Sequence, residues 1–322
     1  MATVSAPKTL LEAVRYFADE DVALAFVAGL HPGWEHGPIC PRCASDKAGF
    51  LATRRLWKCK ACAKQFSVKV GTIFEDSPIS LTKWLPAMWQ IVNCKNGISS
   101  YELARALGVT QKTAWFMGQR LRLAMQSKSF MKMSGNVEVD ETYIGGKARN
   151  MSASRKRKMG FKGKSTGFAG KVAVMGLLER NIKGESHIKT LVVPNNKRSA
   201  LQPIVRENVV AGSTVNTDAL MSCYGLDTDY IHNVIDHAEA YVDGNVHTNS
   251  LENFWSLLKR SIRGTYVSVE PFHLFRYLDE QAFRFNNRKM TDAQRFLAAA
   301  ACIFGRRLTY EGVTGHAVSP SN

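Results

Sequence analysis

The sequence lacks any uninterrupted apolar run of about 18 residues, which is the length that a membrane-spanning helix requires. Residues Met1 to Thr9 also lack the apolar segment that is typical of a secretory signal peptide. These two absences exclude an integral membrane helix and argue against secretion. We therefore expect a cytoplasmic protein with no membrane partner.

Acidic residues are few relative to basic ones. The chain has 27 Asp and Glu residues against 43 Lys and Arg residues, so its formal net charge is +16. An excess of this size favours a polyanionic partner such as nucleic acid, although solubility alone would also account for it. An acidic membrane surface is a weaker alternative, because no basic amphipathic helix with an aromatic face stands out.

The charge imbalance is greatest from Lys147 to Lys171, where nine basic residues occur and no acidic residue. Gly, Ser and Thr are frequent in the second half of this segment. The pattern predicts a loop inserted between the first two strands of a domain. Such a loop is either simply solvated or an arm that contacts DNA phosphates.

Cysteine is scarce and uneven: there are seven residues, and four of them form two close pairs. Cys40, Cys43, Cys59 and Cys62 follow the spacing C-x2-C-x15-C-x2-C. Two tight turns that each present a thiolate pair are typical of a tetrahedral zinc site. A redox C-x-x-C motif is disfavoured because a second pair stands at ribbon spacing. Four protein ligands would close the site, so the zinc is expected to be structural.

Residues 98–125 follow the pattern of two helices around a tight turn. Ser99 or Ser100 is a candidate N-cap of the first helix, and Gly108 stands where the chain must turn. Thr110 would cap a second helix that carries Lys112 and Arg120. This organisation predicts a DNA-binding helix-turn-helix with a recognition helix, although any helical hairpin could share it.

The amino-acid composition changes near residue 136, where short runs rich in Val, Ile and Thr predict β-strands. One helix is expected among them, and from Asn249 to about Arg306 the pattern is helical. Strands with one helix among them, followed by further helices, indicate a mixed α/β domain.

Three acidic residues occupy positions from which they can converge. Asp140 and Asp218 lie at the ends of expected strands, and Glu252 lies near the start of an expected helix. Carboxylates arranged in this way can hold two divalent ions for phosphodiester chemistry, and their oxygen ligands suit Mg²⁺ or Mn²⁺. Three carboxylates alone are weak support, because Glu138 shares the strand face of Asp140 and Glu141 is adjacent.

The motifs that surround the three acidic residues, together with others along the chain, are more specific than the carboxylates alone. The stretches are GPICPRC, VEVDETYIGGK, NTDALMSCY, HTNSLENFWSLLKRSIRGTY and RYLDEQAFRFNNR. In order and spacing they resemble the insertion-sequence transposases with an N-terminal zinc ribbon and an integrase-like DDE domain, the ISXO-like group. The resemblance extends from about residue 10 to residue 306.

This resemblance implies an RNase H-like fold in which Asp140, Asp218 and Glu252 bind Mg²⁺ or Mn²⁺. The implied reaction is in-line attack, first by water at the transposon end and then by the freed 3′-hydroxyl on target DNA. Some members of this family use Asn as the third ligand, so Asn249 and Asn253 are rivals of Glu252. His247 is either an indirect contact of the metal site, a DNA contact or a polar cap at the start of the helix.

Basic residues after Glu252 are expected to contact DNA. Lys259 follows seven residues later on the same helix face, as in the Glu-x6-Lys pattern of many DDE transposases. Arg260 and Arg263 would neutralise phosphates, although an exposed basic helix face would look the same. Partners are therefore the transposon ends and target DNA, bound by a dimer or a larger assembly.

We expect an N-terminal helical segment at 1–36, a zinc ribbon at 37–72, a helix-turn-helix region at 78–130, an RNase H-like catalytic domain at 136–306 and a C-terminal tail at 307–322. Two alternatives to an active transposase stay open. One is a non-enzymatic DNA-binding regulator or decayed transposase, and the other is a nuclease without strand transfer.

Overall fold

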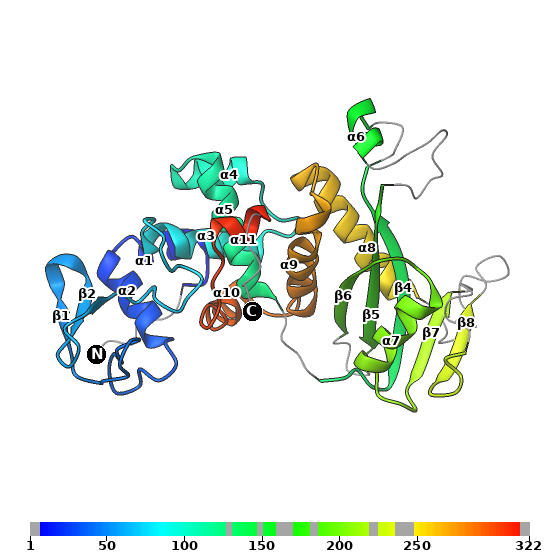
Figure 1. The fold of residues 1–322 in the computed structure, drawn as a ribbon, viewed down its shortest axis with the longest axis horizontal. Helices are drawn as coiled ribbons and strands as arrows, with labels where there is room; N and C mark the ends of the chain where they lie inside the picture. Colours follow the sequence, from blue (N-terminus) through cyan, green and yellow to red (C-terminus); the bar gives the residue numbers. More distant parts are fainter. Residues whose placement is uncertain are drawn as a thin grey trace. The chain divides into compact units, whose positions relative to one another are not determined.

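The structure is a computed structural model that describes residues 7–126, 131–146, 151–158, 170–180, 186–218, 225–235 and 248–315. The chain divides into two compact units (Figure 1). The first unit combines Met1–Gln126 with Lys289–Asn322, and the second is Ser127–Arg288. No helix in the described part of the chain is long and apolar enough to cross a membrane.

The first unit begins with two short helices, as expected. These are α1 (Leu10–Tyr16) and α2 (Glu20–Gly29). The Asp19 side chain accepts hydrogen bonds from the backbone N–H groups of Asp21 and Val22, which explains why a new helix begins there. A three-stranded antiparallel sheet follows, formed by β1 (Ala48–Leu51), β2 (Leu56–Cys59) and β3 (Gln65–Phe66).

Three helices complete the N-terminal part of the first unit: α3 (Leu81–Asn93), α4 (Ser100–Leu107) and α5 (Gln111–Met125). Ser99 and Glu102 form a capping box at the start of α4, and Thr110 caps α5. Gly108 ends α4 with φ of 60°, a left-handed conformation that favours glycine. The expected pair of helices around a tight turn is thus present.

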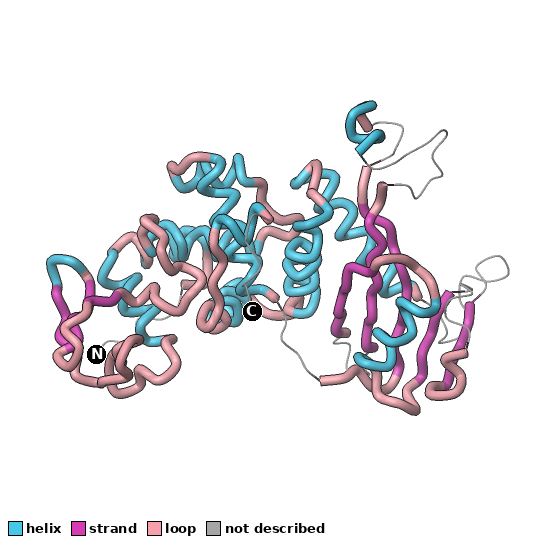
Figure 2. The backbone as a smooth tube through the Cα atoms, viewed as in Figure 1, coloured by secondary structure: helices cyan, strands magenta, loops and turns pink. Residues whose placement is uncertain are grey.

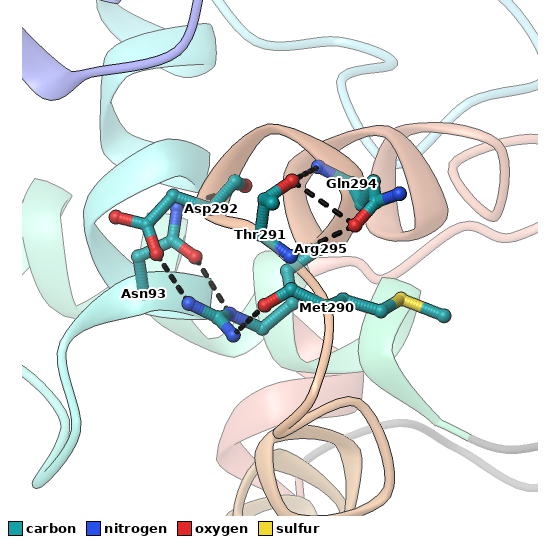
Figure 3. Close-up of polar contacts among 6 residues, drawn as sticks. All are labelled: Asn93, Met290, Thr291, Asp292, Gln294 and Arg295. Atoms are coloured by element: carbon teal, nitrogen blue, oxygen red, sulfur yellow. Dashed lines mark hydrogen bonds and ion pairs between the residues drawn. The ribbon is translucent and has the colours of Figure 1, made fainter.

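The first unit also contains α10 (Asp292–Ala300), which differs from the expected catalytic boundary at residue 306. Arg295 Nε donates to Asn93 Oδ1 of α3 at 2.9 Å, and Asn93 Nδ2 donates to the Asp292 carbonyl at 3.2 Å (Figure 3). Phe296 packs against the rings of Phe26 and Trp89. Because these contacts join α10 to α2 and α3, residues 289–306 belong to the first unit.

The expected frayed tail at 307–322 also differs from the structure. A further helix, α11 (Tyr310–Thr314), is capped by Thr309 and packs against α5. Val313 is fully buried, and the Tyr310 ring meets the Phe116 ring edge to face. Residues 316–322 lie outside the described part of the chain.

In the second unit, five described strands form one mixed sheet (Figure 2). The strands are β4 (Asn136–Ile144), β5 (Val172–Arg180), β6 (His187–Val193), β7 (Thr214–Asp218) and β8 (Ile231–Ile235). Their order is β6-β5-β4-β7-β8, with β4, β5 and β6 antiparallel and with β7 and β8 parallel to β4. The expected strands and the mixed α/β class are confirmed.

Helices cover both faces of this sheet. Apolar residues of α7 (Arg198–Asn208) form one core with alternate residues of the central strands, including Val137, Val139 and Met175. Apolar residues of α8 (Asn249–Ser261) and α9 (Leu274–Asn286) form the other core with Val174 and Leu178. Residues Glu138 and Asp140 of β4 alternate with Val137 and Val139, so they face α8.

Two connections of the second unit matter for the site. A π-helical turn, η4 (Ile262–Tyr266), extends α8, and a 3-10 turn, η5 (Pro271–His273), leads into α9. The basic segment expected between the first two strands does connect β4 to β5, and it contains a short helix, α6 (Ala153–Lys158). The rest of that segment from Lys147 to Ala169, apart from residues 151–158, lies outside the described residues.

Candidate active site and metal centre

The four clustered cysteines lie together at one end of the small sheet in the first unit. Their sulfur atoms are all within 4.8 Å of one another, with 3.7 Å between Cys40 and Cys62 and 3.6 Å between Cys43 and Cys59. Bonds of about 2.3 Å to one tetrahedral zinc would place the sulfurs about 3.8 Å apart. The residues therefore fit a structural zinc ion.

The backbone around these cysteines supports thiolate ligands. Ala44 and Ala63, each directly after a cysteine pair, adopt left-handed φ values of 57° and 58°, which close the two tight turns. The backbone N–H of Cys62, and also that of Ala61, lowers the pKa of Cys59 to about 6. The hydrogen bond with Cys59 in turn raises the pKa of Cys43, so Cys59 takes the negative charge first. A sulfur that is already stabilised as an anion is a good zinc ligand.

Strand pairing brings the first two acidic positions side by side on the large sheet. Asp218 ends β7 as expected, but Asp140 lies in the middle of β4 and not at its end, because β4 stays paired with β5 as far as Ile144. Val139 of β4 pairs with Thr217 of the parallel strand β7. The next residues along the two strands are Asp140 and Asp218. Side chains at the same level of neighbouring parallel strands lie close together. The charge of Asp218 accordingly raises the pKa of Asp140.

The third acidic position, Glu252, lies in the first turn of α8 and faces an open cavity of about 550 Å³. The helical spacing of Glu252, Ser256, Lys259 and Arg263 presents all four to this cavity. The residues that line it are Asp140, Glu141, Thr142, Glu252, Trp255, Ser256, Lys259, Arg260 and Arg263. Among the described residues, Asp218, Asn249 and Asn253 are not part of this lining, and His247 lies outside the described chain.

The carboxylates of this site disfavour one another's charged forms. Burial, followed by the charge of Asp218 and more weakly that of Glu252, raises the pKa of Asp140 to about 6. Burial, followed by the charges of Asp140 and Asp218, raises the pKa of Glu141 to about 8. Burial also lowers the pKa of Lys259, while the charge of Asp140 opposes that effect. The site is therefore rich in carboxyl groups, in part desolvated, and short of positive charge at Asp140 and Glu141.

A hard divalent cation fits this donor set. Glu141 Oε1 is buried and has no hydrogen-bond partner among the described residues. A buried carboxylate oxygen without a donor, beside two further carboxylates, has its charge uncompensated by protein groups. Carboxylate oxygens are the ligands that Mg²⁺ and Mn²⁺ prefer.

Two residues of the site make contacts that the sequence pattern does not indicate. Glu138 is fully buried, pairs with Arg180 of β5, and accepts a hydrogen bond of 2.9 Å from the backbone N–H of Leu251. Trp255 donates its indole N–H to Asp140 Oδ2 at 2.9 Å. The alternation of β4 placed Glu138 on the face of Asp140, but nothing local indicated either partner.

The expected DNA contacts fall into two groups. Lys259, Arg260 and Arg263 line the cavity beside the carboxylates. Lys112 is exposed near the start of α5, with its Nζ 5.0 Å from the centroid of the Tyr310 ring. These four residues are accessible to a polyanion.

The structure corrects the expectation for Arg120, whose side chain is buried within the first unit. Its Nε donates to the Leu308 carbonyl at 3.0 Å, and its Nη1 donates to the carbonyls of Ile73 and Glu75 at 3.1 and 2.7 Å. The guanidinium also stacks over the Phe116 ring. Because its donors are used inside the unit, Arg120 holds segments together and does not face DNA.

Comparison with known proteins decides the family. Residues 132–286 match the family model of the ISXO2-like transposase domain, and residues 18–65 match that of the transposase zinc-ribbon domain. A protein of Haemophilus influenzae named "Uncharacterized transposase-like protein" is 34% identical over 104 residues, which are 32% of this chain and 84% of that protein. The chain belongs to the ISXO2-like transposase family.

A second relative extends the similarity over more of the chain. The "Uncharacterized protein in transposable element ISH50" of Halobacterium salinarum is 28% identical over 256 residues, which are 77% of this chain and 84% of that protein. The ISXO2-like match includes β4 to α9, and the ribbon match includes all four clustered cysteines. The resemblance seen in the sequence is thus confirmed, and the clustered cysteines belong to a transposase zinc ribbon.

Proposed function

We propose that this chain is an active DDE transposase, which cuts DNA at the ends of its element and joins the freed 3′-hydroxyl to target DNA. The observation that carries the proposal is the cavity in which Asp140 and Glu252 face three basic side chains, with Asp218 next to Asp140. Anionic ligands for a cation and cationic groups for a phosphodiester are then available at one place.

Asp140, Asp218 and Glu252 would hold the divalent ions, Mg²⁺ or Mn²⁺. Glu252 is favoured over Asn249 and Asn253 because it lines the cavity with Asp140. When bound, such ions supply positive charge at the phosphate and lower the pKa of a coordinated water. We further propose that the five-stranded sheet is the core of an RNase H-like domain, since it places Asp140, in the middle of β4, beside Asp218, at the end of the adjacent strand β7.

The protein groups around the carboxylates bind and orient the DNA. Lys259, Arg260 and Arg263 are placed one helical turn or less apart along the cavity, which suits successive backbone phosphates. Lys259 is partly buried, which would strengthen its attraction to a phosphate relative to bulk water, whereas Arg260 and Arg263 are exposed. Their role is to fix the scissile phosphate against the carboxylates.

The first unit would recognise the element's ends. The zinc ribbon and the α4–α5 pair, read as a helix-turn-helix, are candidate DNA-binding elements, with Lys112 at the exposed start of α5. Transposition requires two ends to be brought together, so we propose a dimer or larger assembly on DNA.

The proposal is tested with labelled DNA that carries the element's own terminal repeats, incubated with protein and Mg²⁺. Asp218→Asn is compared with wild type and with Asp227→Asn, an exposed acidic residue of the same unit that serves as a matched control. Cleaved and joined products that vanish only in Asp218→Asn support the proposal. DNA binding without product under Mg²⁺ or Mn²⁺ would instead indicate a regulator or a decayed transposase, and cleavage without joining would indicate a nuclease.

A further inference from the structure

The carboxylate of Asp140 is held by two N–H donors, one on each oxygen. Trp255, only 4% exposed on α8, donates its indole N–H to Oδ2 at 2.9 Å. The backbone N–H of Glu141 donates to Oδ1 at 2.7 Å. An indole is a donor only, so it cannot compete for a cation or take up a proton. Each carboxylate oxygen retains a lone pair for another ligand.

The indole reaches Asp140 because the neighbouring strand has no side chain at that point. Gly176 of β5 is the residue paired directly with Asp140. A Cβ at position 176 would lie 2.6 Å from Trp255 Cζ2 and 2.8 Å from Leu251 Cδ2, which is too close for either contact. Glycine at this position therefore allows α8 to lie directly on the strands.

A second anchor joins α8 to β4 beside the first. Glu138, two residues before Asp140, accepts the backbone N–H of Leu251 and is paired with Arg180. The anchors thus lie at Leu251 and at Trp255, on either side of Glu252 in the sequence. Together they fix where the first turn of α8 presents Glu252 relative to Asp140.

We propose that Trp255 is a positioning residue, which holds the Asp140 carboxylate in the orientation that a divalent cation requires, and that Gly176 provides the space for it. This inference rests on the proposed function of the same site. A packing role alone would need only the apolar ring of Trp255 and not its N–H group. The two roles are separable because one depends on a hydrogen atom and the other on shape.

The test replaces Trp255 by Phe in the full-length, zinc-loaded protein. Mn²⁺ binding is measured by electron paramagnetic resonance, and Tm is measured in parallel. We expect Mn²⁺ affinity to fall about 10-fold or more, as when other groups that orient metal ligands are removed. Trp84→Phe is the matched control, because Trp84 is 1% exposed and its indole N–H donates to Ser77 Oγ in the first unit. It should lower Tm but leave Mn²⁺ affinity unchanged.

A second replacement protects the test against misfolding of Trp255→Phe. Benzothienylalanine at position 255, in which sulfur takes the place of the indole N–H, retains the bicyclic shape and removes the donor. It should weaken Mn²⁺ binding about as much as Trp255→Phe, with a Tm close to that of wild type. Wild-type Mn²⁺ affinity in this variant would overturn the positioning role.

Asp140→Asn separates the failure of this inference from failure of the proposed function. If wild type binds Mn²⁺ and Asp140→Asn does not, the metal site is real, and the two Trp255 replacements then decide the positioning role alone. If Asp140→Asn binds Mn²⁺ as wild type does, or wild type binds none, both the inference and the proposed metal site are overturned.

Discussion

Asp140 and Asp218 directly follow a paired position of two parallel strands. Val139 and Thr217 form that pair, so the backbone of the sheet, and not any attraction between the side chains, brings the two carboxylates together. Their charges oppose each other, and the pKa of Asp140 is raised as a result of burial and of this repulsion. A pair that is forced together in this way gains stability when a cation binds it.

The first prediction is that the two carboxylates act as one unit. Asp140→Asn and Asp218→Asn should each slow single-turnover cleavage of terminal-repeat DNA by about 100-fold or more, because either change removes a ligand of the same site. The double variant should be no slower than the slower single variant. Losses that multiply in the double variant would show that the residues act independently.

The second prediction concerns pH and Glu141. Its pKa is raised in the folded protein from 4.5 to about 8, so its contribution to stability is fully present below pH 4.5 and is lost as pH rises through about 8. Glu141→Gln should therefore raise Tm at pH 8.5 relative to wild type by a few degrees, and by less at pH 5.5. The change in Tm is measured by thermal unfolding in Mg²⁺-free buffer. No chelator is added, because a chelator would remove the zinc of the ribbon.

The control for that experiment is Glu207→Gln, which changes an exposed glutamate on α7 and should show no such dependence on pH. Added Mg²⁺ should reduce the advantage of Glu141→Gln at pH 8.5, because a cation in the site favours the charged carboxylate. Equal effects of Glu141→Gln at both pH values would contradict the raised pKa.

The elements around the site could be predicted because their signals are local. Short runs rich in Val, Ile and Thr predicted β4 and β7, and both candidate aspartates stand in short motifs. The contact between Trp255 and Asp140 could not be predicted in this way. It depends on the pairing of Asp140 with Gly176 and on where α8 lies on the sheet, and both join residues that are distant in sequence.

Arg120 illustrates the same limit in the first unit. Helical periodicity places it on α5, a plausible recognition helix, but cannot tell that Leu308 and Ile73 cover that face of the helix. The capping residues of α4 and α5 were predictable, because a cap depends on residues within three positions. The boundary at residue 306 was not, because Arg295 finds its partner Asn93 about 200 residues earlier.

The third prediction is that zinc holds the ribbon together. Cys59→Ser should abolish stoichiometric zinc and unfold the small sheet, because zinc binding supplies most of the folding free energy of such modules. Cys302→Ser, at an exposed cysteine outside the cluster, should retain one zinc per chain. Metal analysis by mass spectrometry and protease resistance of residues 37–72 report the two properties. Full zinc content in Cys59→Ser would exclude the four-cysteine site.

The fourth prediction separates Lys112 from Arg120. Lys112→Ala should weaken DNA binding and reduce the slope of log affinity against log salt by about 1, since one phosphate contact is lost. Arg120→Met should instead lower stability by about 1–3 kcal/mol, because three buried or part-buried hydrogen bonds to backbone carbonyls are lost. Below its Tm, Arg120→Met should keep the wild-type salt slope. A reduced salt slope in Arg120→Met would show that Arg120 contacts DNA after all.

The fifth prediction is that the C-terminal helix α11 stabilises the first unit. Val313 of α11 is fully buried, so Val313→Ala should lower the free energy of unfolding by about 1–3 kcal/mol through the cavity that it creates. Val14→Ala is the matched control, because Val14 is 44% exposed on α1 of the same unit and should change stability by less than about 0.5 kcal/mol. Denaturant unfolding followed by Trp fluorescence measures both. Equal stability of the two variants would contradict this prediction. Residues 307–322 would then be a frayed tail, and the packing of Tyr310 against Phe116 would contribute nothing to the fold.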